Sequence, residues 1–212
     1  MKYFIGLDLG QANDYSALAV VEKIVPPDPL AGVDIHVIGG SLRPEARPRP
    51  RYDLVWLDRY PLHLPYPEMV GRVAALLASP PLRGRNLLAI DNTGVGRPIV
   101  DLFRQAGLRP VPITISGGSA VTAQDGGYVV PKRDLVGAVK VALQSARLKI
   151  ARGLPLADVL TRELLSFEVR ISAAGHDQYA AWRENEHDDL VLAAALALWS
   201  GEKMPSRTLV TF

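Results

Sequence analysis

Cysteine is absent from all 212 residues of the sequence. Disulfide bonds, zinc sites built from thiolates and cysteine nucleophiles are therefore excluded. The absence agrees with a protein that works in a reducing compartment. Any metal site in this chain must use oxygen or nitrogen ligands.

Long apolar runs are also lacking. The longest, Leu190 to Trp199, is well short of the about 20 residues that a membrane-spanning helix requires. The N-terminal segment has one basic residue, Lys2, and soon meets Asp8, which is not the pattern of a secretory signal peptide. We expect a cytoplasmic protein without a membrane partner.

An excess of either charge is missing as well. The 24 Lys and Arg residues nearly balance the 22 Asp and Glu residues, so the formal net charge is only +2 at pH 7. This is weak evidence for an acidic partner, and there is no basic tail. Hydrophobic residues make up 48% of the chain, enough for a sizeable core. With no internal repeat and no clear linker, residues 1–212 are expected to form a single domain.

The first half of the chain has the pattern of an α/β protein. Two apolar segments around a turn predict a hairpin that opens the chain, and an alternating segment predicts a third strand. Helices and strands then alternate, which implies a parallel part of the sheet with right-handed crossovers. The expected strands are 3–9, 16–24, 52–60, 86–90 and 111–115, and the expected helices are 67–79 and 97–106.

The second half is expected to be mainly helical. Residues 117–128 are rich in glycine and are predicted to form a mobile loop, after which Pro131 and Pro155 each start a helix. Residues 168–172 and 178–182 alternate as in a hairpin. The final helix, from His187 to Ser200, is apolar on all sides and should be buried, with Gly201 ending it.

Acidic residues interrupt this apolar pattern at three places. Asp8 and Asp91 each end an apolar strand, and the pair Asp188-Asp189 opens the apolar last helix. A carboxylate at the edge of a core is costly unless it is paired or binds a metal. In open α/β sheets, ligand sites gather at the C-terminal ends of strands. The layout therefore indicates a site for hard cations such as Mg²⁺, which prefer oxygen ligands.

Each of these aspartates also has an ordinary structural interpretation. An aspartate after a strand is often a turn residue or a helix cap, which applies to Asp8 and Asp91. An aspartate in the first turn of a helix interacts well with the helix dipole, which applies to Asp188. The combination of all three positions favours a metal-dependent nuclease. Such enzymes hold two ions about 3.5–4 Å apart, one to generate the attacking hydroxide and one to stabilise the departing 3′ oxygen.

Three stretches of the chain resemble the nuclease domain of phage terminase large subunits, a member of the ribonuclease H-like superfamily that also contains the RuvC-type resolvases. They are Gly6–Gly10, Ile90–Gly96 and His187–Ala193. The resemblance runs through nearly the whole chain, and the His-Asp-Asp opening of the last helix is its most specific part. It implies an α/β ribonuclease H-like fold, in which helices flank a mixed β-sheet.

The resemblance also implies metal-dependent endonucleolytic cleavage of DNA with two Mg²⁺ or Mn²⁺ ions. In that case Asp8 bridges the ions, Asp91 binds one and Asp188 binds the other, while Asp189 is a ligand or supports one. Adjacent helical residues do not share a face, so one member of the Asp188-Asp189 pair should be the main metal ligand. The implied substrate is duplex DNA in the cytoplasm of a bacterial host.

One departure from the terminase pattern concerns the ATPase motor. Terminase large subunits carry this motor before the nuclease, but here Met1 almost adjoins the first expected strand and no G-x-x-x-x-G-K-[ST] loop occurs. The chain is thus expected to be a free-standing nuclease or a fragment. A separate packaging ATPase or other phage packaging proteins are the implied partners.

Basic residues near the expected site are candidates for contact with phosphates. Each can equally be an ordinary solvated side chain. No stripe of exposed aromatic residues suggests base reading, so little sequence specificity is expected. The candidates are Lys132, Arg133, Arg170, His176 and Arg183.

Other functions remain open on the sequence alone. A RuvC-like junction resolvase, or a non-catalytic DNA-binding module with a relic site, has the same acidic pattern. Asp8-Leu9-Gly10 also resembles the phosphate loop of actin-like ATPases and sugar kinases, but those chains need a second such lobe. Gly94-Val95-Gly96 lacks the third glycine of a dinucleotide-binding fingerprint.

Overall fold

The sheet at the centre of the molecule has eight strands in the order β6-β7-β5-β4-β1-β2-β3-β8. The structure is a computed structural model, and it describes residues 2–10, 14–27, 49–94, 97–174 and 188–204. The strands are β1 (Tyr3–Asp8), β2 (Ser16–Ile24), β3 (Arg51–Tyr60), β4 (Asn86–Asp91), β5 (Val111–Ser116), β6 (Thr122–Gln124), β7 (Gly127–Pro131) and β8 (Leu148–Ile150).

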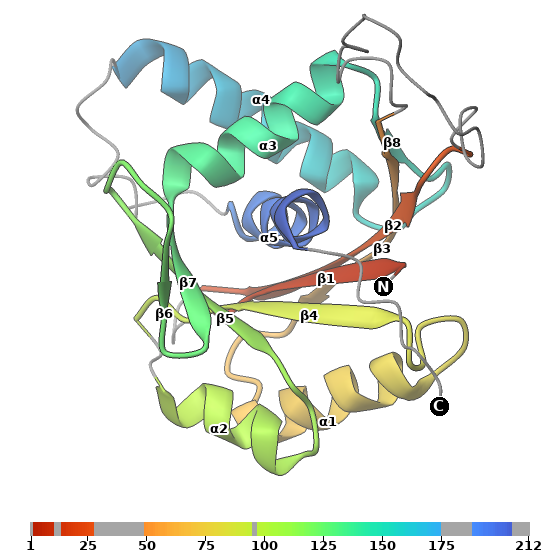
Figure 1. The fold of residues 1–212 in the computed structure, drawn as a ribbon, viewed down its shortest axis with the longest axis vertical. Coiled ribbons are helices and arrows are strands. Elements are labelled where there is room, and N and C mark those ends of the chain that lie inside the picture. Colours follow the sequence, from red (N-terminus) through yellow and green to blue (C-terminus); the bar gives the residue numbers. More distant parts are fainter. Residues whose placement is uncertain (1, 11–13, 28–48, 95–96, 175–187, 205–212) are drawn as a thin grey trace, which may run out of the picture.

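Helices cover both faces of this sheet (Figure 1). Helices α1 and α2 lie on one face, and α3, α4 and α5 lie on the opposite face, with α5 between the sheet and the helices α3 and α4. The helices are α1 (Tyr66–Ala78), α2 (Arg97–Gln105), α3 (Lys132–Gln144), α4 (Ala157–Ala174) and α5 (Asp189–Lys203).

The sheet is mixed, as expected. Strands β1, β2 and β3 form an antiparallel meander, whereas β4 runs parallel to β1, β5 parallel to β4 and β7 parallel to β5. The meander agrees with the predicted opening hairpin and third strand. The parallel part agrees with the predicted alternation of strands and helices, because parallel strands need crossover connections.

Strand β1 separates two hydrophobic clusters. Its alternate side chains point to opposite faces, as in any strand. Phe4 belongs to the cluster that contains α5, while Ile5 and Leu7 belong to the cluster with α1 and α2. Asp8 has the same parity as Phe4 and Gly6, so its side chain lies on the α5 face of the sheet.

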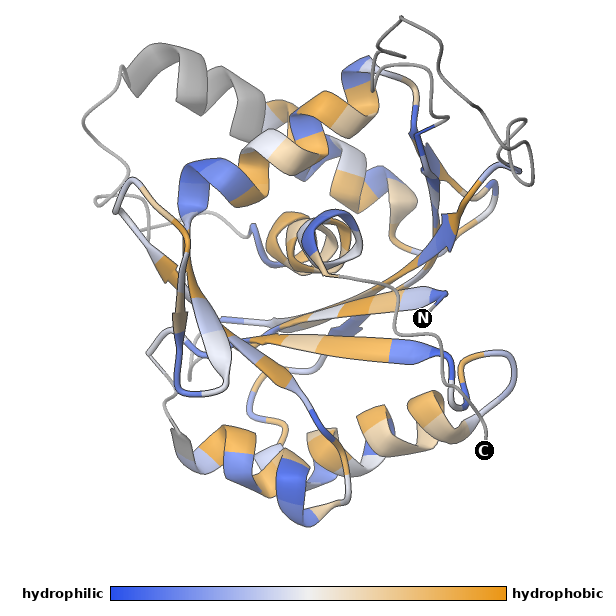
Figure 2. Ribbon diagram, viewed as in Figure 1, coloured by the Kyte–Doolittle hydropathy of each residue, from blue (hydrophilic) through white to orange (hydrophobic). Residues whose placement is uncertain are grey.

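Helix α5 is buried on all sides, as its sequence predicts. Every residue from Asp189 to Gly201 is buried, and Figure 2 shows the helix mostly in hydrophobic colours between the sheet and the other helices. No helix in the described part of the chain is long and apolar enough to cross a bilayer. The apolar character of α5 therefore reflects its central position in the core.

Gly6 allows α5 to approach β1. A Cβ atom at this position would lie 2.0 Å from the carbonyl oxygen of Ala193 and 2.7 Å from the backbone nitrogen of Ala197. Both neighbours are backbone atoms in a buried helix, so they cannot yield as a flexible side chain would. The strand and the helix must separate to admit even a methyl group.

We therefore expect Gly6→Ala to lower the free energy of unfolding by about 1–3 kcal/mol, the usual cost of overpacking a core. Denaturant melts with circular dichroism measure this. Gly71→Ala on α1 is the matched control, because nothing lies within 4 Å of a Cβ there. That variant should gain about 0.5–1 kcal/mol, since alanine favours a helix. Equal effects of the two substitutions would contradict the close packing of β1 against α5.

Several elements of the second half differ from the sequence-based expectation. The segment expected to be a mobile loop, residues 117–128, contains β6 and the start of β7. The two strands form a hairpin whose turn is Asp125-Gly126, with φ of 51° and 77°. An Asp-Gly turn between alternating residues is a strong hairpin signal. It was overlooked because the segment as a whole is rich in glycine, which is typical of loops. β8 has only three residues and was not predicted.

The ends of the last two helices were also predicted incorrectly. Residues 168–172, expected to form one arm of a hairpin, lie within α4, and residues 178–182 lie outside the described residues. Gly201 does not end α5, which continues to Lys203. A Cβ at Gly201 would lie 2.8 Å from the Tyr52 ring, so this glycine serves helix packing.

Candidate active site

Asp8 and Asp91 come together because β1 and β4 are parallel neighbours that end at the same edge of the sheet. Asp8 is the last residue of β1, and Asp91 is the last residue of β4. Both are buried, with 8% and 6% of their surface exposed. Two carboxylates thus lie at the C-terminal edge of adjacent strands, as the sequence predicts.

The electrostatic environment of Asp8 strongly disfavours its charged form. Burial is the largest cause that raises the pKa of Asp8 well above its usual range, followed by the negative charges of Asp91, Asp188 and Asp189. A hydrogen bond with the Asp91 side chain acts in the same direction. Asp8 therefore lies within electrostatic reach of the other three predicted aspartates.

Asp91 also shapes the turn that follows it. Its Oδ1 accepts a hydrogen bond of 2.7 Å from the backbone N–H of Thr93, the local pattern of an Asx turn. The Thr93 hydroxyl in turn accepts a 2.8 Å hydrogen bond from the backbone N–H of Ile115 on β5. Asp91 is thus a turn residue through its Oδ1 atom. An oxygen in an Asx turn can also bind a metal ion, so the two roles are compatible.

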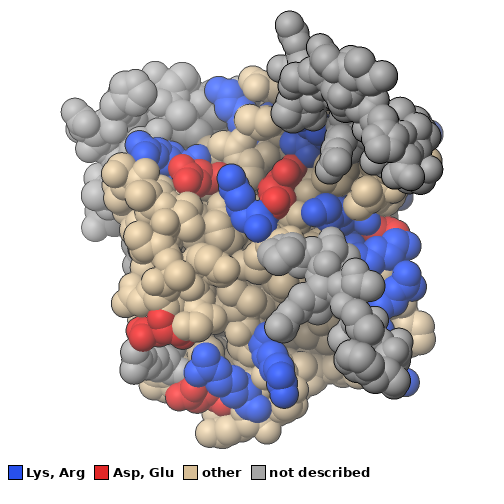
Figure 3. Space-filling view, viewed as in Figure 1, with Lys and Arg blue, Asp and Glu red and all other residues tan. Residues whose placement is uncertain are grey.

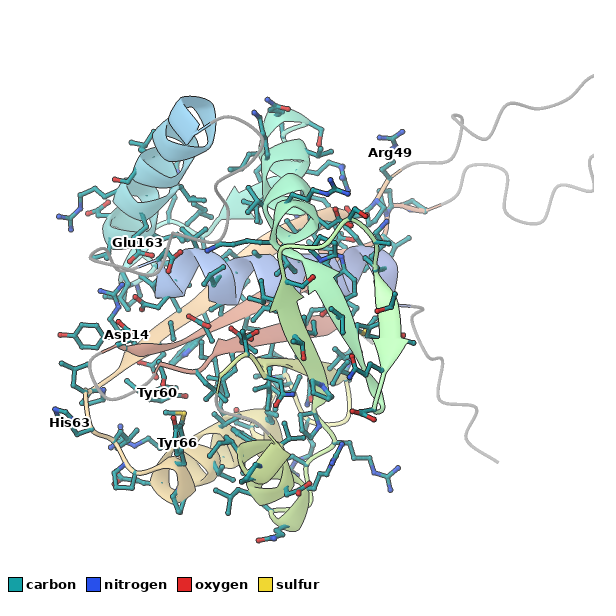
Figure 4. All side chains as sticks on the ribbon, turned by 90° about the vertical axis from the view of Figure 1, so that its left-hand side faces the viewer. Asp14, Arg49, Tyr60, His63, Tyr66 and Glu163 are labelled. Atoms are coloured by element: carbon teal, nitrogen blue, oxygen red, sulfur yellow. The ribbon has the colours of Figure 1, made fainter. Side chains whose placement is uncertain are left out.

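Gly10, which closely follows β1, is held at the sheet edge by two hydrogen bonds. Ser16 Oγ accepts a 3.0 Å hydrogen bond from the Gly10 N–H, and the Tyr66 hydroxyl donates to the Gly10 carbonyl at 3.2 Å. A Cβ at Gly10 would lie 2.2 Å from the carbonyl oxygen of Asp14, so the chain bends tightly here. In Figure 4, Asp14 lies at this edge, with Tyr66 toward the α1 side.

Asp188 and Asp189 lie at the start of α5, on the same face of the sheet as Asp8. Asp188 is the N-cap residue, and its side chain is 27% exposed. Lys132, the first residue of α3, places its Nζ 3.5 Å from Asp188 Oδ2. This contact joins one of the predicted DNA-contacting residues to the acidic group.

Asp189 has a different environment, which the sequence did not reveal. Its two carboxylate oxygens accept hydrogen bonds from Arg59 on β3, from Nε at 2.8 Å and from Nη2 at 3.1 Å. Arg59 Nη2 also pairs with Glu163 on α4. Burial and the charge of Asp189 raise the pKa of Glu163 to about 7, although Arg59 opposes this effect. Figure 4 shows Glu163 on the helix side of the sheet, near the start of α5.

Sequence analysis missed Arg59 and Glu163. Arg59 is in an alternating strand and Glu163 in an amphipathic helix, where charged residues normally face solvent. The sequence of β3 gives no clear signal, because Arg59 follows Asp58 in a strand that has charged residues near both ends. Pairing across 130 and 104 residues, from Arg59 to Asp189 and to Glu163, cannot be read from local patterns.

The residues present fit a divalent cation in their chemistry. All four aspartates supply the oxygen donors that Mg²⁺ and Mn²⁺ prefer. Burial, and then the charges of the other three carboxylates, raise the pKa of Asp8, and a bound cation would relieve the repulsion between these carboxylates. Within the described residues, no three Asp, Glu or His side chains are already arranged as a metal cage. Arg59 and Lys132 instead neutralise part of the acidic charge.

Of the other predicted DNA-contacting residues, only Arg133 has a side chain that the structure describes. Arg133 is exposed and donates a hydrogen bond of 2.5 Å to the Ser119 carbonyl. The side chain of Arg170 and the whole of His176 and Arg183 lie outside the described residues. On the face shown in Figure 3, the described Lys and Arg side chains are interspersed with acidic and uncharged ones.

The fold is similar to that of solved terminase nucleases. The large terminase nuclease from thermophilic phage G20c aligns over 92% of this chain and 80% of its own, with a TM-score of 0.54 and 17% identity. A second structure of that nuclease, with bound zinc, aligns at a TM-score of 0.51 and 19% identity, over 92% of this chain and 79% of its own.

A viral nuclease has the same architecture. The human cytomegalovirus terminase nuclease domain, soaked with manganese and with inhibitor bound, aligns over 95% of this chain and 83% of its own, with a TM-score of 0.53 and 12% identity. No protein-family model and no curated protein sequence matches the chain. The predicted ribonuclease H-like α/β fold, and the resemblance to terminase nuclease domains at the level of fold, are confirmed.

Proposed function

We propose that this protein is a metal-dependent endonuclease that hydrolyses phosphodiester bonds of duplex DNA with two Mg²⁺ or Mn²⁺ ions. The observation that supports this most directly is the meeting of buried Asp8 and Asp91 at the ends of adjacent parallel strands, within electrostatic reach of Asp188 and Asp189. The terminase nucleases of the same fold include structures with zinc and with manganese. Residues 1–212 would act as one nuclease domain.

The chain's contribution to this reaction is positioning and charge. Asp8 and Asp91 on rigid strands and Asp188 at a helix start would hold the metal ions with carboxylate oxygens. When bound, such ions activate water and neutralise the charge that develops on the leaving oxygen. Lys132 lies beside Asp188, where its ammonium group would attract a DNA backbone phosphate.

The proposed function predicts both substrate and products. Linear duplex DNA should be cleaved with Mg²⁺ or Mn²⁺ and left intact in chelator. The products should carry 5′-phosphate and 3′-hydroxyl ends, because water would attack the phosphorus and the bond from phosphorus to the 3′ oxygen would break. Ligation of the products without prior kinase treatment measures the ends.

A panel of substrates distinguishes the alternatives. Linear duplex, a four-way junction and RNA are incubated with Mg²⁺, Mn²⁺, Ca²⁺ or chelator. Cleavage of the junction alone would replace the proposed activity with that of a RuvC-like resolvase. Binding of DNA without cleavage of any substrate would identify a non-catalytic module with a relic site.

A further inference from the structure

Two adjacent aspartates open α5, and their contacts differ in kind. Asp189 is 5% exposed, and both of its oxygens are engaged by the planar guanidinium of Arg59. Asp188 is more exposed and has one longer contact, 3.5 Å, with the flexible ammonium group of Lys132. Bidentate arginine–carboxylate pairs are short, directional and strong, whereas a lysine contact is a point-charge interaction.

Glu163 extends the Arg59–Asp189 pair into a clamp on the start of α5. One oxygen of Glu163 pairs with Arg59, and the other accepts a hydrogen bond of 3.3 Å from the backbone N–H of Val191. The first N–H groups of a helix have no partner within the helix, so Glu163 satisfies one of them. Arg59 also lies over the Tyr15 ring, 5.1 Å from its centroid.

We infer that Asp189 is a positioning residue and that Asp188, with Asp8 and Asp91, supplies the metal ligands. This inference rests on the proposed function. Arg59 and Glu163 hold Asp189 and the first turn of α5 against β3 and α4. Asp188 precedes that turn directly, so the clamp fixes where its carboxylate stands relative to Asp8. Arg59 thus acts on the metal site through Asp189 without touching the ions.

Calorimetric titration with Mn²⁺ alone tests this assignment. Wild type should bind two ions. Asp188→Asn should lose one of them. Asp189→Asn should still bind two, with affinity lowered by about ten- to a hundredfold, the usual effect of removing a residue that orients a ligand. In the cleavage assay, raising Mn²⁺ should restore the kcat of Asp189→Asn and leave that of Asp188→Asn low.

Arg59→Lys tests the clamp from the other side. It keeps the charge and loses the bidentate geometry, so it should lower Mn²⁺ affinity as Asp189→Asn does. The variant that combines Asp189→Asn with Arg59→Lys should bind Mn²⁺ no more weakly than either single variant, because all three variants break the same Arg59–Asp189 contact. Arg51 and Asp53 form the matched control: they make a similar bidentate pair on the same strand, exposed to solvent, and Asp53→Asn should leave Mn²⁺ binding unchanged.

Three outcomes separate the inference from the proposed function. Loss of one ion in Asp189→Asn would make Asp189 a ligand and overturn the inference alone. A lower melting temperature of Asp189→Asn with unchanged Mn²⁺ affinity would reduce the clamp to a structural role and also overturn it. A wild-type protein that binds no Mn²⁺ and cuts no DNA would overturn the proposed function itself, and the inference with it.

Discussion

Asp8→Asn should lower the rate of DNA cleavage by at least about a hundredfold at saturating Mg²⁺ or Mn²⁺, because it removes a charge that anchors the metal ions. Asp91→Asn and Asp188→Asn should have effects of the same order. Asparagine keeps the size of the side chain and an oxygen acceptor, so the Asp91 variant can retain the hydrogen bond from Thr93. The loss of activity would then reflect charge rather than local unfolding. Initial rates on linear duplex DNA measure it.

Asp14→Asn is the matched control for this series. Asp14 follows the same strand at the same edge of the sheet but is exposed. Its substitution should change the rate by less than about twofold, as expected of a surface residue outside the site. Full activity in Asp8→Asn, or an equal loss in Asp14→Asn, would remove the basis for a metal site at this edge.

Asp8→Asn should also raise the melting temperature in chelator at neutral pH. Burial and three neighbouring carboxylates raise the pKa of Asp8 in the fold, so at neutral pH the wild-type fold is destabilised relative to the unfolded chain. The variant lacks this cost. Each kcal/mol that is recovered should raise the melting temperature by about 2–4 °C in a chain of this size. Differential scanning calorimetry in chelator measures the change.

The pH dependence of this effect has a definite sign. The pKa of Asp8 is raised in the folded protein, so the unfolded chain releases this proton first as the pH rises above about 3.9, the ordinary aspartate pKa. Wild-type stability therefore falls from that pH up to the pKa of Asp8 in the fold. Glu163 contributes a similar fall between pH 4.5 and about 7. Asp8→Asn should therefore match wild type near pH 3 to 4, the region of the unfolded aspartate pKa of about 3.9, and exceed it increasingly toward neutral pH.

With Mn²⁺ added, wild type should melt at a higher temperature than Asp8→Asn, the reverse of the order in chelator. Wild type should gain roughly 2.7 kcal/mol when Mn²⁺ is a hundredfold above its Kd, whereas Asp8→Asn should gain less because it binds the ion more weakly. Two results together would show that Asp8 is a structural residue of the strand end. Asp8→Asn would melt at a lower temperature than wild type in chelator, and Mn²⁺ would leave the melting temperature of wild type unchanged.

The sequence by itself determined the elements that depend on local pattern and the positions of the acidic residues. Period-two and helical patterns predicted β1 to β5, α1, α2 and the buried α5 close to their observed bounds. Asp8, Asp91 and Asp188 stood out because each interrupts an apolar segment at its end. Such signals are local, since burial of one face imposes a periodicity on the chain itself.

Only the tertiary structure decided which charges meet. The parallel pairing of β1 with β4 and the path of α5 over Gly6 bring Asp8, Asp91 and the start of α5 to one edge. The Arg59 clamp on Asp189 joins strand β3 to helices far along the chain, so no local pattern encodes it. The same holds for β8, whose three residues form a strand only because β3 offers them an edge. Long-range partners depend on packing and topology, and neither is visible in the spacing of residues.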